Sequence, residues 1–187
     1  MKNKNDRKTG LTIEVLPETQ LTAATDNAIS VLLDTCFPDT FEGRSYFKQM
    51  PHGRILAWKD TALAGHMGYD LRIMRFGEQL KRVFGIIDLC VEATQRQQGI
   101  GAALLQTAIS HAEEARADAM LLVTQQPAYY TRFGFVTVSS ASVTWLGIED
   151  RRSVGLLTKS LAGEIMVRVE KNTPLPIEQI DMLGYLY

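Results

Sequence analysis

The middle third of the chain constrains the fold most, because it orders three strands, one helix and a fourth strand with short connections. Three consecutive stretches are rich in apolar and β-branched residues: RILAWKD (54–60), ALAGHMGYDLRIMRF (62–76) and QLKRVFGIIDLCV (79–91). Lys59-Asp60 and Gly77-Glu78 are the expected turns between them. An amphipathic helix then begins near Gly101, and AMLLVT (119–124) follows as a strand covered on both faces. This order predicts an antiparallel meander followed by one strand–helix–strand crossover.

The remaining segments extend that sheet. We expect strands at LTIEVLP (11–17), FVTVSS (135–140) and GEIMVRVE (163–170), and helices at 22–37, 39–50 and 127–133. The stretch 145–159 has no clear period and is expected to be a long loop. The predicted fold is α/β (α+β), a mixed and mostly antiparallel sheet with helices on both faces, and not a doubly wound sheet. One domain is expected over 1–187, with residues 1–10 flexible.

Composition excludes several classes of partner. The 187 residues are 45% hydrophobic and 22% charged, which is ordinary for a globular protein. A net charge of −1 gives no reason to expect nucleic acid or an anionic membrane as partner, and no apolar run is long enough to span a bilayer. The two cysteines, Cys36 and Cys90, have neither metal-ligand nor disulfide-framework spacing. We therefore expect a cytoplasmic protein without a metal.

The turn that opens the central helix, Arg96 to Gly101, carries more glycine than a helix start needs. A Walker-type phosphate loop is excluded because Gly101 is followed by Ala102-Ala103, and a dinucleotide fingerprint is excluded because Leu104 stands where a small residue is required. The remaining functional interpretation is a backbone cradle for a pyrophosphate, aided by the helix N-terminus and by Arg96. The alternative is an ordinary strand-to-helix turn with a solvated arginine.

Arg96-x-x-Gly99-x-Gly101, after the strand end Leu89-Cys90-Val91, resembles the coenzyme A signature of the GNAT (GCN5-related) acetyltransferases. YYTRFGF (129–135) resembles the second landmark of that family, and the order of elements matches from 11 to 170. The resemblance implies the GNAT acyl-CoA N-acyltransferase fold and transfer of an acetyl group from acetyl-CoA to a primary amine. The cofactor-binding residues that it implies are Leu89, Cys90, Val91, Arg96, Gln97, Gln98, Gly99, Ile100, Gly101 and Ala102.

One branch of acyltransferases shows a further, patchier resemblance. TFEGRSYF (40–47), AGHMGYDLR (64–72) and the glycine turn resemble, in that order, the rhizobial nodulation N-acyltransferases (the NodA branch). That resemblance implies an acyl carrier protein or a longer acyl group as donor and a sugar amine as acceptor. A third interpretation is a non-catalytic domain that binds or senses acetyl-CoA.

Three residues are candidates for proton transfer. Tyr130 is the expected general acid for the departing thiolate, and the alternative is a core tyrosine. Asp88 lies on the strand that leads to the turn, and it is either the general base or an exposed carboxylate without a catalytic role, as is Glu92. His66, in AGHMG, is either a base at neutral pH or a buried, hydrogen-bonded strand histidine.

Cys90 lies in an apolar strand and is expected to be an inert hydrophobic residue, so we expect direct transfer in a ternary complex rather than an acyl-enzyme. The expected acceptor is an amine on a small molecule or a peptide, and the sequence does not specify it. The apolar tail PLPIEQIDMLGYLY (174–187) could cover a sheet edge or a second copy of the chain in a homodimer.

Overall fold

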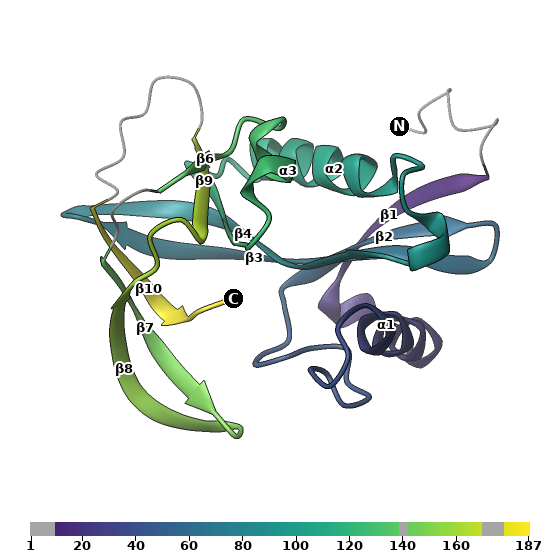
Figure 1. The fold of residues 1–187 in the computed structure, drawn as a ribbon, viewed down its shortest axis with the longest axis horizontal. Helices are drawn as coiled ribbons and strands as arrows, with labels where there is room; N and C mark the ends of the chain where they lie inside the picture. The colour runs from purple at the N-terminus through teal and green to yellow at the C-terminus, as the bar shows by residue number, and fades with distance from the viewer. Residues whose placement is uncertain (1–9, 139–141, 170–177) are drawn as a thin grey trace. The chain divides into compact units, whose positions relative to one another are not determined.

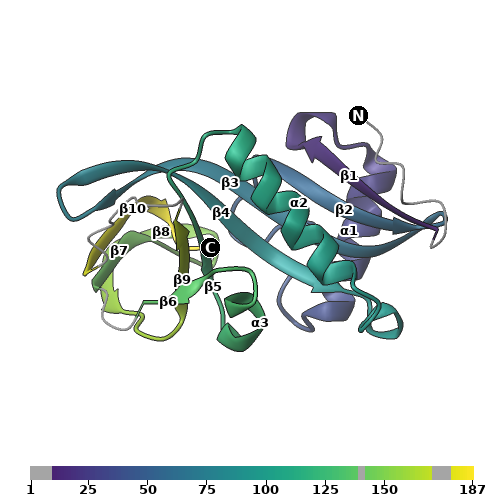
Figure 2. The same cartoon turned by 90° about the horizontal axis from the view of Figure 1, so that it is seen from above.

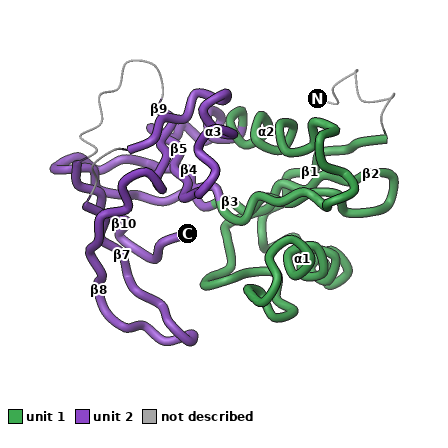
Figure 3. The backbone as a smooth tube through the Cα atoms, in the orientation of Figure 1, with its two compact units in different colours: residues 1–69, 87–110 green, residues 70–86, 111–187 purple. Residues whose placement is uncertain are grey.

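The structure, a computed structural model, describes residues 10–138, 142–169 and 178–187 (Figure 1). It divides into two compact units: residues 1–69 and 87–110 form unit 1, and residues 70–86 and 111–187 form unit 2 (Figure 3). The boundary falls inside strands β3 (Ala62–Phe76) and β4 (Gln79–Val91) and helix α2 (Ile100–Glu114), not in a linker. Nearly all of the segment 1–10, which the sequence predicts to be flexible, lies outside the described residues.

The sheet of unit 1 follows the predicted meander. Strand β1 (Leu11–Pro17) pairs antiparallel with β2 (Gly53–Lys59) over its whole length. Strand β2 pairs antiparallel with β3, with a bulge between Ala57 and Trp58, and β3 neighbours β4. These four predicted strands are confirmed.

Two helices lie on opposite faces of these strands, as expected (Figures 1 and 2). Helix α1 (Ala23–Cys36) begins where the Thr22 side chain accepts a hydrogen bond from the Thr25 N–H, and its buried face packs on a cluster that includes Leu56 and Cys90. Of the apolar stripe that the sequence predicts on α2, Ala115 is half-buried and the other five residues are buried: Leu104, Leu105, Ala108, Ile109 and Ala112. Burial of these apolar faces on both sides stabilises the sheet.

The short helix expected at 39–50 is wrong. Asp39 (φ +61°), Glu42 (φ +53°) and Gly43 (φ +77°) adopt left-handed backbone conformations that interrupt a right-handed helix. The segment is a series of turns instead, and it carries the chain from α1 to Pro51.

Unit 2 contains the predicted crossover. Strand β5 (Ala119–Val123) runs parallel to β4, and the pairing extends from Val83↔Ala119 to Gly85↔Leu121. Strand β9 (Ile165–Val169) pairs antiparallel with β5, and β6 (Val136–Thr137) pairs with β9. Helix α3 (Pro127–Thr131) begins with proline in its first turn. Part of the expected strand 135–140 lies outside the described residues.

The long loop expected at 145–159 is also wrong. The chain forms a hairpin of β7 (Ser142–Glu149) and β8 (Arg152–Ser160), closed by Asp150-Arg151 with positive φ at both positions. Strand β8 is exposed at all but one residue, so it lacks the alternation by which a strand is recognised. Strand β10 (Gln179–Tyr185), from the apolar tail, pairs with β7 and β3 and was not predicted as a strand.

Candidate active site

The turn before α2 has the backbone geometry of an anion cradle. Gln97 (φ +64°) and Gly99 (φ +81°) are left-handed, and a side chain on Gly99 would meet open space, so glycine is needed there for its φ alone. The first helical hydrogen bond runs from the Ala103 N–H to the Gly99 carbonyl (2.9 Å). The N–H groups of Ile100, Gly101 and Ala102 therefore precede the helical ladder and stand at the positive end of the helix.

Side chains of unit 1 brace this turn. Lys59 Nζ, at the end of β2, donates to Gln95 Oε1 (2.8 Å) and to Gln98 Oε1 (2.7 Å). Arg96 Nε donates to the Val91 carbonyl (3.1 Å), and the Glu92 carboxylate accepts from the Thr94 N–H (3.0 Å). The turn thus carries two cations on a fixed backbone, and Lys59 was not predicted from the sequence. Glu92 acts as a local cap of this turn, through its hydrogen bond with the Thr94 N–H.

Gly65 of β3 allows α2 to lie close to the sheet. A Cβ atom at Gly65 would stand 3.0 Å from Ile100 Cγ2, 3.1 Å from Leu104 Cδ1 and 3.2 Å from the Cys90 carbonyl. These are closer than side chains normally approach, so the glycine sets the distance between the helix start and strands β3 and β4.

Asp88 has an unusual backbone conformation within β4. Its φ of +50° is left-handed inside a strand, and its carbonyl accepts a hydrogen bond from His66 Nδ1 (3.1 Å). The pairing of β4 with β5 stops at Gly85, so Asp88 and the three residues after it continue past the last β5 partner found in the described part of the chain. A positive φ in a non-glycine residue is strained and is typical of functional positions.

The Asp88 carboxyl titrates near neutral pH. Burial raises its pKa to about 6, and the cationic side chains of Arg54 and Lys48 oppose that shift. Burial in turn lowers the pKa of Lys48, and Asp88 opposes this. A carboxyl group with this pKa is largely ionised at pH 7 yet basic enough to accept a proton.

Arg54, next to Gly53 at the start of β2, is 1% exposed, and each of its three guanidinium nitrogens donates a hydrogen bond. Its Nε and Nη2 donate to the two carboxylate oxygens of Glu18 (2.7 and 2.9 Å), and Nη1 donates to the Ser45 carbonyl (2.6 Å). Nη1 also lies 3.1 Å from His66 Nε2. The sequence did not predict Arg54 or Glu18 as members of the site.

His66 is completely buried, which matches the second of the two interpretations given for it. Burial and the Arg54 charge lower the pKa of His66 to about 3, so the ring is neutral. Since Arg54 can only donate, Nε2 accepts, and the proton of the ring sits on Nδ1 and is donated to the Asp88 carbonyl.

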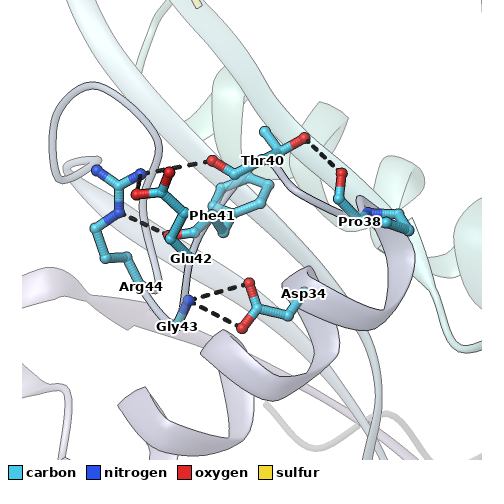
Figure 4. Close-up of polar contacts among 7 residues, drawn as sticks. All are labelled: Asp34, Pro38, Thr40, Phe41, Glu42, Gly43 and Arg44. Carbon is cyan, nitrogen blue, oxygen red and sulfur yellow. Dashed lines mark hydrogen bonds and ion pairs between the residues drawn. The ribbon is translucent and has the colours of Figure 1, made fainter. Parts of the chain in front are cut away.

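The turns after α1 hold the segment that supplies Ser45 and Lys48. Both oxygens of the Asp34 carboxylate accept the Gly43 N–H (3.2 and 3.0 Å), and Arg44 Nε donates to the Phe41 carbonyl (2.6 Å) (Figure 4). Phe41 is 1% exposed and belongs to the cluster under α1. This loop is therefore tied to the core of unit 1.

The two cysteines are neighbours in the fold, which their distant positions in the sequence do not indicate. A hydrogen bond with Cys90, helped by the Arg96 charge, lowers the pKa of Cys36 to about 7, while the same contact and burial raise the pKa of Cys90. Cys36 Sγ also lies 3.6 Å from the Val91 carbonyl. Both thiols are free and Cys90 is buried, while the inertness of its thiol stays a prediction.

Tyr130 belongs to unit 2, whereas the turn and Asp88 belong to unit 1. Its ring lies edge-on to Tyr129 (5.1 Å between centroids) and to Phe135 (6.1 Å). Burial, with the neighbouring Tyr129, raises the pKa of Tyr130 to about 12, and a hydrogen bond with Thr124 opposes this. The phenol is protonated at neutral pH, and its role as an acid stays a prediction.

The described residues contain no group of three or more His, Cys, Asp or Glu side chains placed to hold a metal ion. Across the same residues, none of the helices has both the length and the apolar character needed to span a membrane.

Comparisons with known proteins point to one family. A family model described as "Acetyltransferase (GNAT) domain" matches residues 19–138. The GNAT family N-acetyltransferase YhbS from Escherichia coli, solved in complex with CoA, is similar with a TM-score of 0.65 and 16% identity, over 96% of this chain and 93% of that chain.

Two further solved structures share this fold. An acyl-CoA N-acyltransferase from Pseudomonas aeruginosa has a TM-score of 0.59 and 20% identity, over 85% of this chain and 99% of that one. A GNAT family acetyltransferase from Brucella melitensis, in complex with acetyl-CoA, has a TM-score of 0.52 and 18% identity, over 67% and 83%. A search of curated proteins found no match.

Proposed function

This chain belongs to the GNAT acetyltransferase family and is an acyltransferase, and we propose that it transfers the acetyl group of acetyl-CoA to a primary amine. The observation that carries the proposal is one continuous segment, in which Asp88, with its strained backbone, is followed eleven residues later by Gly99 of the turn and then by the start of α2 at Ile100. A proton acceptor and an anion cradle thus lie on the same strand–turn–helix unit.

In this proposal the turn binds the diphosphate of the donor. The N–H groups that precede the helical ladder, the helix dipole and the Arg96 and Lys59 charges all favour a bound anion. The end of β4 from Leu89 to Val91 extends beyond its pairing with β5, which leaves an edge along which an extended pantetheine arm could add. The related structures solved with CoA and acetyl-CoA support this choice of donor.

Asp88 is the proposed general base. A primary ammonium with a pKa near 10 is about one part in a thousand neutral at pH 7, so the amine needs help to lose its proton. Asp88 is half-buried on strand β4, and its carboxyl, with a pKa of about 6, is largely ionised at pH 7. It would take the proton of the amine directly or through one water. His66 is not suited to this task, because a fully buried ring with a pKa of about 3 cannot store a proton near neutral pH.

The amine nitrogen would attack the thioester carbonyl, and the C–S bond would break as the C–N bond forms. The thiolate then takes a proton from the proposed acid, Tyr130. Direct transfer is favoured over an acyl-enzyme because the one cysteine on this strand, Cys90, is buried and its pKa is raised, which keeps the thiol protonated and poorly nucleophilic.

The proposal is tested by a screen for thiol release from acetyl-CoA across classes of amine, run beside a thermal-shift titration with acetyl-CoA. We expect stabilisation by acetyl-CoA and thiol release with at least one primary amine. Stabilisation without thiol release from any amine would instead support a sensing domain, and neither effect would remove acetyl-CoA as the ligand.

Replacing Tyr130 with Phe removes one hydroxyl and leaves the ring contacts with Tyr129 and Phe135 in place. We expect kcat to fall at least about tenfold with little change in acetyl-CoA affinity, because a proton donor acts on the leaving thiolate and not on donor binding. Steady-state kinetics and calorimetric titration measure the two quantities, and Tyr129→Phe is the matched control. An unchanged kcat would remove Tyr130 from the mechanism.

A further inference from the structure

We propose that Arg54 and His66, with Glu18 behind them, are positioning residues that hold Asp88 in its left-handed backbone conformation and place a cation near its carboxyl. The inference rests on the proposed function, since it concerns the group named there as the base. It assigns a role in the reaction to three side chains that do not themselves meet a substrate.

The chain of contacts runs in one direction. Glu18 grips Arg54 through two hydrogen bonds, Arg54 donates to His66 Nε2, and His66 Nδ1–H donates to the Asp88 carbonyl. Each contact orients the next side chain. Because Arg54 can only donate, Nε2 of His66 must accept, and the proton of the ring is therefore on Nδ1. The last hydrogen bond is made at a residue with φ +50°, where the strand would otherwise straighten.

Sheet register places these groups together. In the β2–β3 pairing Arg54 lies opposite Gly68, and Leu56 lies opposite His66, so Arg54 and His66 are diagonal neighbours on adjacent strands. A Cβ atom at Gly68 would stand 3.4 Å from Ile87 Cβ and 3.4 Å from Pro51 Cγ, so Gly68 brings β3 close to Ile87 of β4. The pairing of β2 with β3 therefore brings Arg54 and His66 together, and His66 contacts Asp88 of β4.

Electrostatics adds a second effect. The charged groups that act on the Asp88 carboxyl are Arg54 on β2 and Lys48 on the preceding loop, and the Asp88 charge in turn helps to raise the pKa of Cys90 on β4. His66 is neutral, so it contributes a hydrogen bond and no charge. Arg54 is thus one of two cations that favour the ionised carboxyl against its burial.

Stability alone does not account for the buried ion pair of Arg54 and Glu18. Replacing a buried ion pair with apolar residues of similar volume is often neutral or stabilising, because two charges must otherwise be taken out of water. Arg54 is the largest fully buried side chain of the described residues, and its partner Glu18 is 17% exposed. A role in the chemistry of the Asp88 carboxyl would explain why the Arg54–Glu18 pair is buried, which stability alone does not explain.

The first test compares two replacements of His66. His66→Gln keeps an acceptor for Arg54 and a donor for the Asp88 carbonyl, whereas His66→Leu keeps neither. We expect kcat to stay within about threefold of wild type for Gln and to fall at least about tenfold for Leu, with acetyl-CoA affinity nearly unchanged in both, since a small misplacement of a catalytic group lowers the rate strongly. Circular dichroism and thermal melting check that each variant is folded.

The second test removes the buried charges as a pair, so that no carboxylate is left unpartnered. In Glu18→Gln with Arg54→Met, the acidic limb of the kcat/KM profile is expected to move to higher pH by at least about half a unit, because a nearby cation lowers a carboxyl pKa. A ¹³C NMR titration of the Asp88 carboxyl, assigned with Asp88→Asn, should show the same shift without any turnover. Arg116→Met, at an exposed position, is the control and should leave both unchanged.

The outcomes separate the two proposals. If Asp88→Asn keeps full activity, the base assignment fails, and the NMR titration still reports whether Arg54 controls the carboxyl. If Asp88→Asn is inactive but His66→Leu and the double variant keep the wild-type kcat and pH profile, the positioning role is overturned while the base stands. A loss of activity in His66→Gln equal to that in His66→Leu would also overturn it, since it would make His66 a titrating group.

Discussion

Asp88→Asn is expected to lower kcat by about 10²- to 10⁴-fold, the range over which general acid–base catalysis contributes. The amide cannot accept a proton from the amine, while asparagine tolerates the left-handed backbone of Asp88 as well as aspartate does, so the local backbone conformation should persist. Steady-state kinetics with the amine found in the thiol-release screen measures the loss. The residual rate should lack the acidic limb near pH 6 that the wild type is expected to show.

The same variant, Asp88→Asn, should stabilise the folded protein although it lowers kcat. The pKa of Asp88 is about 6 in the folded protein, above its ordinary value of 3.8, so the native state binds the proton more tightly and the carboxyl costs stability as the pH rises from about 4 to 6. Asp88→Asn should therefore melt at a higher temperature than wild type at pH 7 to 8, and the difference should disappear near pH 4. Glu92→Gln, a carboxylate that only caps the adjacent turn, should show neither effect.

The second large effect is expected from the turn itself. Gly99→Asp puts a carboxylate into open space at the start of α2, where the helix dipole favours it but a bound diphosphate would be repelled. Two unit charges about 4 Å apart near a protein surface repel by about 4 kcal/mol, so CoA affinity should fall by about 10²-fold or more. Isothermal titration calorimetry with CoA measures this.

Gly99→Asn is the matched control, because it has the same shape and the same tolerance of a positive φ but no charge. We expect it to lose no more than a few-fold in CoA affinity. Equal losses in the two variants would mean that the backbone conformation of the turn matters and the sign of the charge does not, which contradicts an anion cradle.

Much of the fold was predictable because it depends on local patterns. The meander, α1, α2, β5 and the parallel crossover follow from alternation, helical periodicity and two-residue turns, and the structure confirms them. The hairpin β7–β8 was missed because its turn, Asp150-Arg151, lacks the glycine that usually marks such turns and because β8 has no buried face. The helix expected at 39–50 is wrong because Asp39, Glu42 and Gly43 have left-handed backbone conformations, which a right-handed helix cannot contain.

The candidate site was predictable only in part. The glycine turn and Asp88 are visible in the sequence because they lie on one continuous segment. Arg54, Glu18, Lys48 and Lys59 are not, because they approach that segment from other strands and loops, and the pairing of β1, β2 and β3 brings them there. An arginine opening an otherwise apolar strand was the one available signal for Arg54.

The pairing of Cys36 with Cys90 has the same origin, since α1 packs on the strand that carries Cys90. The resemblance of 40–47 and 64–72 to the nodulation N-acyltransferases stays a prediction, as do the single domain and the homodimer. The amine acceptor is a matter for the screen, because specificity depends on loops whose chemistry varies most between acyltransferases of one fold.

The most direct measurement for the central claim is a crystal structure of the full chain with CoA. The account predicts diphosphate oxygens within hydrogen-bonding distance of the backbone N–H groups between Gly99 and Ala102, with the Arg96 side chain beside them. A nucleotide bound elsewhere, with these N–H groups facing only solvent, would contradict it.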